Sequence, residues 1–142
     1  MIHVINGPNL NLLGKREPQI YGHLSLTDIC DTLTEAFPDT NLQFYQSNHE
    51  GELIDYIQKA GFDPATEGIV INPGAYAHYS IALRDAIAAI PAPVIEVHIS
   101  NIYAREDFRH NSVTAPATKA VITGLGAQGY AAAIQALINP LF

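Results

Sequence analysis

The chain has 142 residues, enough for one domain with a hydrophobic core and too few for an eightfold β/α barrel of roughly 250 residues. Seven lysines and arginines stand against fourteen aspartates and glutamates, a net charge of −7 without any basic run, which argues against nucleic acid as a partner. Only 15% of the residues are charged, against about 25% in an average soluble domain. Assembly of several copies of the chain would explain this low charge content.

The cysteine content and the absence of known motifs argue against a disulfide, a metal site and a nucleotide cofactor. Cys30 is the single cysteine, so neither a disulfide within the chain nor a cysteine metal cluster is available. No His-x-His pair, H-E-x-x-H motif or acidic cluster predicts a metal site, and no G-x-G-x-x-G or P-loop predicts a nucleotide cofactor. We recognise no signal peptide and no apolar run of membrane-spanning length, so we expect a cytoplasmic protein without a membrane partner.

Apolar runs of strand length alternate with segments of helical periodicity, which indicates a parallel sheet with helices on both faces. The pattern predicts strands at 2–6, 42–46, 68–72, 94–99 and 119–123, and helices at 25–37, 51–60, 79–90 and 127–138. Ser25, with Asp28 three residues later, is typical of a helix start, and Gly61 of a helix end. The last helix is apolar nearly all round, and we expect it to be buried against a partner subunit.

No repeat, low-complexity segment or linker interrupts this alternation, so residues 1–142 are expected to form a single catalytic domain. For five strands joined by right-handed crossovers, we predict a doubly wound sheet of order 2-1-3-4-5. Ligands bind such sheets beyond the carboxyl ends of the strands, where the strand order reverses. Residues just after Asn6 and Asn72 should therefore face the ligand.

The connection after the first strand, residues 6–22, is far longer than the usual 4–6 residues or so. It combines glycines and prolines with polar side chains, among them Asn9, Arg16 and Tyr21. A loop tyrosine is commonly a packing residue, but a nearby guanidinium would favour its phenolate form. We therefore interpret this segment as a lid with functional side chains.

Polar residues also mark the end of the fourth strand. Glu96, His98 and Ser100 alternate along the chain and should lie on one side of the sheet. A buried carboxylate is costly unless it is paired, and His98 is the nearest candidate for pairing. Simpler interpretations stay open: Asn72-Pro73-Gly74 as a plain turn, His98 as a core histidine, and Arg105 and Arg109 as a solvated charged face.

Several sequence blocks together closely resemble type II 3-dehydroquinate dehydratases, in the right order and over essentially the whole chain. The blocks are N-G-P-N-L-N-L-L-G-K-R-E-P-Q-I-Y-G at 6–22, S-N-H-E-G at 47–51, N-P-G-A-Y at 72–76, E-V-H-I-S-N at 96–101, A-R-E-D-F-R at 104–109 and G-x-G-A-Q-G-Y at 124–130.

This resemblance implies a trans elimination of water from 3-dehydroquinate that needs neither cofactor nor metal and gives 3-dehydroshikimate, in the shikimate or quinate pathway. It implies that Tyr21 is the base, that Arg16 stabilises charge beside it, and that Asn9 helps to hold a water against the enolate. His98, oriented by Glu96, would protonate the leaving hydroxyl.

The resemblance also implies which residues bind substrate, and how the chain assembles. The implied binding residues are Asn72, His78, Arg109, Ile99 and Ser100, together with Asp85 reaching the site of a neighbouring subunit. The implied assembly is a homododecamer built as four trimers. Tyr79 and Tyr103 depart from the residues common in the family.

Two alternatives remain at this point. A non-catalytic, flavodoxin-like binding module would have the same fold and would bind quinate-like acids without converting them. A Schiff-base dehydratase would need an amine, and Lys15 on the predicted lid is the plausible one.

Overall fold

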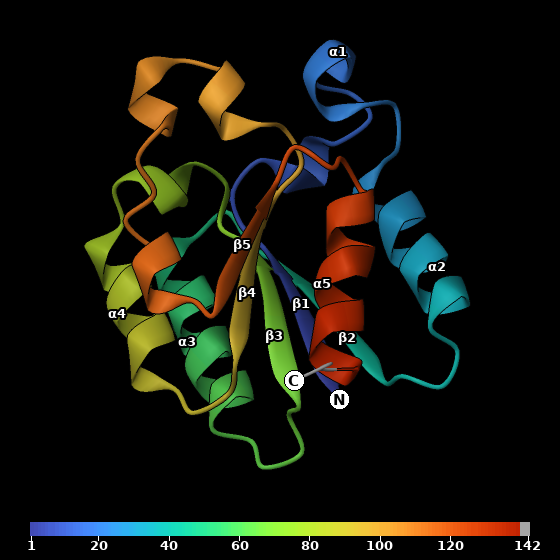
Figure 1. The fold of residues 1–142 in the computed structure, drawn as a ribbon, viewed down its shortest axis with the longest axis vertical. Helices are drawn as coiled ribbons and strands as arrows, with labels where there is room; N and C mark the ends of the chain where they lie inside the picture. Colours follow the sequence, from blue (N-terminus) through green and yellow to red (C-terminus); the bar gives the residue numbers. More distant parts are fainter. Residues whose placement is uncertain (140–142) are drawn as a thin grey trace.

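The computed structural model describes residues 1–139 and shows a five-stranded parallel sheet between two layers of helices (Figure 1). The strand order is β2-β1-β3-β4-β5, which confirms the predicted order and the flavodoxin-like, doubly wound class. The strands are β1 (Ile2–Asn6), β2 (Leu42–Gln46), β3 (Gly68–Asn72), β4 (Val94–His98) and β5 (Ala120–Thr123).

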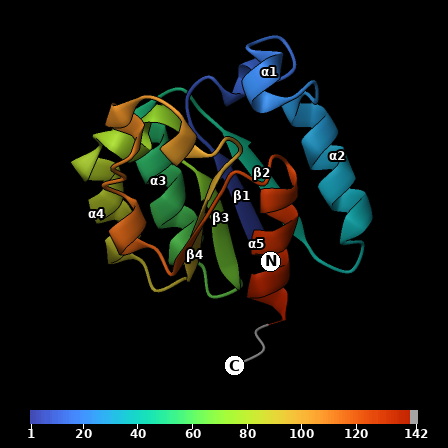
Figure 2. The same ribbon diagram turned by 45° about the horizontal axis from the view of Figure 1, so that its top comes forward.

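Four of the helices cover the sheet, two on each face (Figure 2). Helices α2 and α5 pack on one face, and α3 and α4 on the other. Their bounds are α2 (Leu26–Ala36), α3 (Glu50–Gly61), α4 (Ile81–Ala89) and α5 (Gln128–Ile138). None of the helices within residues 1–139 is long and apolar enough to cross a membrane.

The three central strands carry the core. Every residue of β1, β3 and β4 is buried, as expected for strands covered on both faces. In the parallel pairing of β1 with β3, Asn6 lies opposite Asn72. The carboxyl ends of these strands therefore meet at one edge of the sheet, with the polar side chains that follow them.

Local signals explain where helices begin. Ser25 and Asp28 form the predicted capping box at the start of α2: the Ser25 hydroxyl accepts from the Asp28 amide, and the Asp28 carboxylate accepts from the Ser25 amide. Helix α4 starts later than predicted, because Gly74–His78 forms a 3₁₀ turn and the Ser80 hydroxyl caps the helix by accepting from the Leu83 amide.

Helix α5 packs on the sheet of its own chain through Tyr130, Ala133 and Ile134, which are fully buried. Its apolar character is thus partly explained within one subunit, while Gln135 and Ala136 are exposed. Burial of the remaining side against a partner subunit stays a prediction.

The long connection after β1 contains helical turns and is not an irregular loop throughout. It contains a 3₁₀ turn, Leu10–Leu12, and a short helix α1, Pro18–Tyr21, neither of which the sequence pattern predicts. Asn9 and Glu17 precede these turns in the left-handed backbone region. Helix α1 lies at the carboxyl end of the sheet (Figures 1 and 2).

Candidate active site

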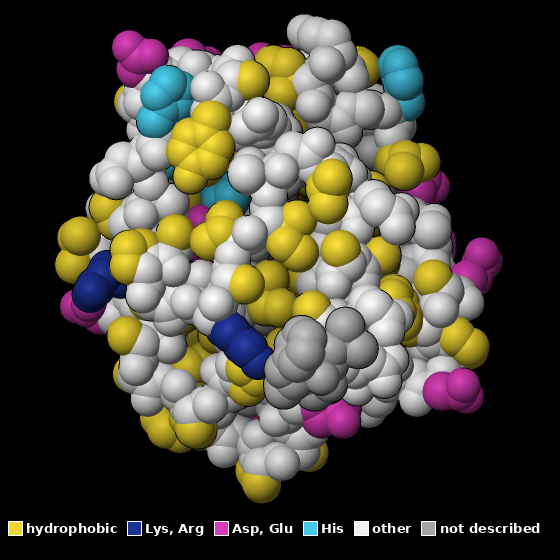
Figure 3. Space-filling view, in the orientation of Figure 1, with side chains coloured by type: hydrophobic (Ala, Val, Ile, Leu, Met, Phe, Trp, Pro, Cys, Tyr) yellow, Lys and Arg dark blue, Asp and Glu magenta, His cyan; other side chains and the backbone are white. Residues whose placement is uncertain are grey.

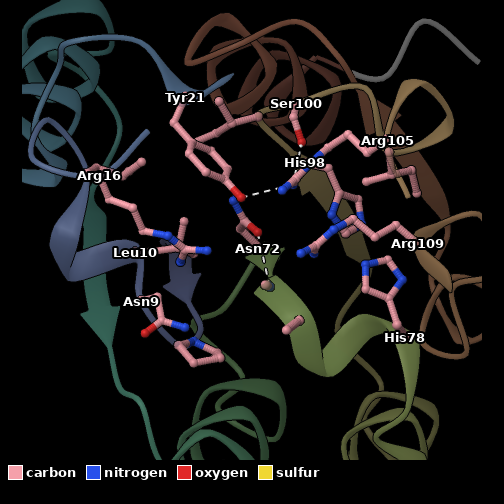
Figure 4. Close-up of a pocket in the computed structure, with 16 residues that line it drawn as sticks. Asn9, Leu10, Arg16, Tyr21, Asn72, His78, His98, Ser100, Arg105 and Arg109 are labelled. Carbon is pink, nitrogen blue, oxygen red and sulfur yellow. Dashed lines mark hydrogen bonds between the residues drawn. The ribbon is translucent and has the colours of Figure 1, made fainter. Parts of the chain in front are cut away.

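A cavity opens beyond the carboxyl ends of β1, β3 and β4, at the predicted position in the fold (Figure 4). The segment 8–21 covers one side of it, and the segment 98–109 the other. The side chains that line it are mostly polar or charged; among them are Asn9, Arg16, Tyr21, Asn72, His78, His98, Ser100, Arg105 and Arg109.

Two arginines surround the Tyr21 phenol. Nη1 of Arg105 donates hydrogen bonds to the Tyr21 hydroxyl at 2.9 Å and to the Ser100 hydroxyl at 3.2 Å. The guanidinium carbon of Arg16 lies 5.6 Å from the centre of the Tyr21 ring, and that of Arg105 5.3 Å. Both guanidinium groups thus place positive charge beside the phenol. The sequence pointed to Arg16 as the partner of Tyr21; the direct hydrogen bond comes from Arg105.

Behind the cavity, His98 is paired with a fully buried carboxylate. Nε2 of His98 lies 2.6 Å from Oε1 of Glu96, as the alternation along β4 predicted. The Glu96 carboxylate also accepts hydrogen bonds from Ser112 at 2.8 Å and Thr114 at 2.6 Å. Burial alone would raise the pKa of Glu96, but the hydrogen bonds from His98, Thr114 and Ser112 together hold that pKa below its usual value.

A second histidine stands beside the first. The rings of His78 and His98 are 6.2 Å apart, and Nδ1 of His78 lies 2.9 Å from the carbonyl oxygen of Asn111. Burial lowers the pKa of His78, so this ring is neutral near pH 7. If Nδ1 carries the proton and donates it to that carbonyl, Nε2 is an acceptor. In that form, Nε2 of His78 accepts a hydrogen bond from a hydroxyl group of a ligand.

Backbone geometry shapes the floor of the cavity. Gly7 passes so close to Pro73 that a Cβ atom on Gly7 would lie 2.4 Å from the Pro73 carbonyl oxygen, and its amide donates to the Asn72 carbonyl at 2.8 Å. The Asn9 amide donates to the side-chain oxygen of Asn48 at 3.0 Å. Asn48 belongs to the S-N-H-E-G block, which the resemblance singled out without giving it a role.

Most of the residues that the sequence analysis proposed are brought together here. Asn9, Arg16, Tyr21, Asn72, His78, His98, Ile99, Ser100 and Arg109 all line the cavity, and Glu96 lies directly behind His98. Asp85 lies exposed on α4, paired with Arg84, and does not line this cavity. Its predicted place in a neighbouring subunit's site is untested. Tyr79 and Tyr103 are exposed and do not line the cavity either.

Arg105 and Arg109 do not form a solvated face. Their side chains are only 11% and 17% exposed, and both line the cavity. Together with Arg16 they place three guanidinium groups around a polar hollow in an acidic chain, which suits a small, oxygen-rich anion. Among residues 1–139, no three His, Cys, Asp or Glu side chains are grouped so that they could hold a metal ion.

Comparisons with known proteins agree with this geometry. The family described as Dehydroquinase class II matches residues 1–138. The chain is 57% identical to 3-dehydroquinate dehydratase 1 of Agrobacterium fabrum over 141 residues, which cover 98% of this chain and 96% of that protein. It is 52% identical to the 3-dehydroquinate dehydratase of Bacillus subtilis over 138 residues, which cover 96% and 92% of the two chains.

Solved structures show the same relationship. The type II dehydroquinase from Butyrivibrio crossotus superposes with a TM-score of 0.94 at 51% identity, covering 97% of each chain. That from Propionibacterium acnes superposes with a TM-score of 0.90 at 43% identity, covering 97% of this chain and 96% of the other. Whole-length matches in sequence and in fold, together with a cavity at the switch point of the sheet, establish that this chain belongs to the class II dehydroquinase family.

Proposed function

We propose that the chain is a 3-dehydroquinate dehydratase, a hydro-lyase that converts 3-dehydroquinate into 3-dehydroshikimate and water in the shikimate or quinate pathway. Family membership supports the activity. One observation carries the proposed residue roles: Tyr21 and His98 line the same cavity. The Tyr21 phenol lies beside the guanidinium groups of Arg105 and Arg16, and the His98 imidazole is paired with the Glu96 carboxylate. We assign the phenol as the base and the imidazole as the acid.

The first step removes a proton next to the ketone. Tyr21, as its phenolate, takes this proton, and the electron pair moves onto the ketone oxygen to form an enolate. Arg105 and Arg16 place positive charge beside the phenol during this step. Asn9 would help to hold a water molecule against the enolate oxygen, so that the developing charge is shared by hydrogen bonds.

The second step expels the hydroxyl group. The enolate collapses, the carbon–oxygen bond breaks, and His98 gives its proton to the departing oxygen, so that water leaves. Because Nε2 of His98 faces Glu96, Nδ1 is the nitrogen left for this transfer. The contact with the Glu96 carboxylate fixes the orientation of the imidazole. Exchange of one proton each with solvent then restores Tyr21 and His98.

The remaining polar groups hold the substrate. We propose that Asn72, His78 and Arg109 bind its hydroxyl groups, and that the Ile99 backbone and the Ser100 hydroxyl bind its carboxylate. Arg105 donates to the Ser100 hydroxyl and so adds positive charge at this end of the cavity. These assignments place both ends of a small hydroxylated acid between the two long connections.

The test follows ultraviolet absorption of the conjugated enone product after 3-dehydroquinate is mixed with the parent, with Tyr21→Phe and with Tyr103→Phe. Tyr103 is exposed and outside the cavity, so its variant loses the same atom without touching the site. We expect turnover by the parent and by Tyr103→Phe, and none by Tyr21→Phe, which should still bind substrate.

An inactive parent that binds quinate-like acids would instead support the binding module. Borohydride trapping of substrate on the protein would support a Schiff base and contradict the enolate route. Lys15, the amine that this route would need, does not line the cavity.

We also propose that the chain assembles into a homododecamer of four trimers in the cytoplasm, with Asp85 completing a neighbour's site. Hydrophobic side chains gather over the middle of the face seen in Figure 3, and acidic ones lie around its margin. On the edge strand β5, Val121 is exposed, so the strand offers both backbone groups and apolar surface. Native mass spectrometry should give twelve chains. A monomer with full activity would contradict both the assembly and the role of Asp85.

A further inference from the structure

Tyr130 lies fully buried in the first turn of α5, and its hydroxyl reaches the ends of β1 and β3. The hydroxyl donates to the side-chain oxygen Oδ1 of Asn6 at 2.6 Å and accepts from the side-chain nitrogen Nδ2 of Asn72 at 2.9 Å. Asn6 and Asn72 are paired in register across the two strands. A single phenol therefore bridges the two strand ends at which the sheet order reverses.

The direction of these hydrogen bonds restricts the Asn72 amide. A phenol carries one hydrogen, and here it is given to Asn6, so the phenol oxygen can only accept from Asn72. Burial raises the pKa of Tyr130, which keeps this hydrogen in place at neutral pH. On its other side, Oδ1 of Asn72 accepts from the Gly74 amide at 3.2 Å. The side-chain nitrogen and the side-chain oxygen of Asn72 therefore each have a defined hydrogen-bond partner.

One hydrogen of the Asn72 amide is left unused by these contacts. Nδ2 carries two hydrogens, and Tyr130 takes one of them. Asn72 lines the cavity beside Tyr21, so the second hydrogen is available to a ligand there (Figure 4). The site thus offers a hydrogen-bond donor at this point, and it selects an acceptor oxygen on the ligand.

We propose that Tyr130 is a positioning residue for substrate binding, which holds the Asn72 amide with its NH₂ group toward the substrate. The proposal rests on the proposed function for the identity of the substrate, an acid that carries several hydroxyl groups. It assigns a function to the hydroxyl of Tyr130 that is separate from the packing of its ring. Without that hydroxyl, the Asn72 amide keeps only the hydrogen bond from the Gly74 amide to hold its nitrogen toward the substrate.

The main variant is Tyr130→Phe, which keeps the buried ring and removes one oxygen. We expect the KM for 3-dehydroquinate to rise on the order of tenfold while kcat stays within about threefold, because binding to substrate and to transition state is weakened equally. The matched control is Tyr56→Phe. The Tyr56 hydroxyl contacts His3 at 3.0 Å and lies outside the cavity, so this variant should leave the KM unchanged.

A second variant tests the direction of the hydrogen bonds while Tyr130 stays intact. In Asn6→Ala the phenol loses its acceptor and is free to donate to Oδ1 of Asn72, which allows the amide to reverse. We expect a rise in KM similar to that in Tyr130→Phe. Calorimetric titration of 3-dehydroquinate into Tyr21→Phe and into Tyr21→Phe/Tyr130→Phe should show the same fold loss of affinity without chemistry.

The outcomes separate the inference from the proposed function. Turnover by the parent with an unchanged KM in both Tyr130→Phe and Asn6→Ala would overturn the positioning role alone. A rise in KM that also occurs in Tyr56→Phe would overturn the positioning role as well. A parent that binds but does not turn over would sink the proposed activity, and the calorimetric comparison would still decide the role of Tyr130. A parent that does neither would sink both.

Discussion

Arg105 follows Tyr21 by 84 residues in the sequence, yet its Nη1 donates a hydrogen bond to the Tyr21 hydroxyl at 2.9 Å. The two residues come from the two long connections that border the cavity, so the contact ties one connection to the other (Figure 4). The same nitrogen also donates to Ser100. The proposed base is therefore positioned by a residue outside its own segment.

Replacing Arg105 with glutamine should lower kcat by about a hundredfold, because the cation that donates a hydrogen bond to the Tyr21 hydroxyl is lost. Arg105→Lys keeps the positive charge and should retain more activity than the glutamine variant. Stopped-flow rates between pH 6 and 10 measure this; a glutamine variant with the parent's kcat would contradict the role.

The sheet and the Glu96–His98 pair follow from local sequence patterns, whereas the roles of most other site residues come from the family resemblance. Apolar runs, as in 68–71, are typical of strands covered on both faces, and the Glu96–His98 pair follows from the two-residue period of a strand. These features depend on neighbours in the sequence, which is why the sequence alone reveals them.

Other features depend on contacts between distant segments. The reach of Arg105 to Tyr21 is set by the path of two loops, and the four residues of α1 are too few to show a helical period. Gly61 was expected at a helix end and is the last residue of α3, but without the left-handed backbone that is typical of glycine there. A Cβ there would lie 2.5 Å from Ile90, so the glycine serves close packing instead. No local pattern distinguishes these two uses of glycine.

The buried Glu96 carboxylate predicts a measurable effect of pH on stability. Thr114→Val removes one of its donors and should cost roughly 1.5–3 kcal/mol of unfolding free energy at pH 7. The pKa of Glu96 is lowered in the fold, so its stabilisation is present above the ordinary carboxyl pKa and is lost as pH falls through the lowered value. The cost of the substitution should therefore shrink toward acidic pH.

Urea unfolding of the parent, Thr114→Val and Thr118→Val at pH 7 and pH 4 tests this effect. The Thr118 hydroxyl donates to backbone carbonyls and not to a carboxylate, so its variant should show a small cost that does not change with pH. Equal pH dependence of the two variants would show that Thr114 does not act through Glu96.

The close passage of Gly7 beside Pro73 predicts that Gly7→Ala damages both stability and activity. A Cβ at 2.4 Å from a backbone oxygen forces the two cavity-lining segments apart, at a cost of roughly 1–3 kcal/mol or more. Gly51→Ala is the matched control, since a Cβ there meets nothing within 4 Å and should be neutral or mildly stabilising. Thermal unfolding and kcat/KM for both variants measure the difference; a Gly7→Ala protein as active as Gly51→Ala would contradict the steric argument.

His3 predicts a second effect of pH, at a buried position outside the cavity. Its ring is buried on β1, with Nδ1 3.0 Å from the Tyr56 hydroxyl, and Nε2 is buried without a hydrogen-bond partner among residues 1–139. Burial lowers the pKa of His3; Asp63 opposes this shift, while the N-terminus and Lys59 add to it. The unfolded chain therefore binds a proton first as pH falls.

Stability should consequently decrease below about pH 6.5, by no more than about 1.4 kcal/mol per pH unit for each such proton. The pKa of His78 is also lowered, so His3→Gln should flatten the decline between pH 7 and 5 without abolishing it. His23→Gln, a change at an exposed position, should leave the slope unchanged. Urea unfolding at half-unit pH steps measures these slopes. If the unfolding free energies of His3→Gln and His23→Gln both change with pH as that of the parent does, His3 is not the source of the acid sensitivity.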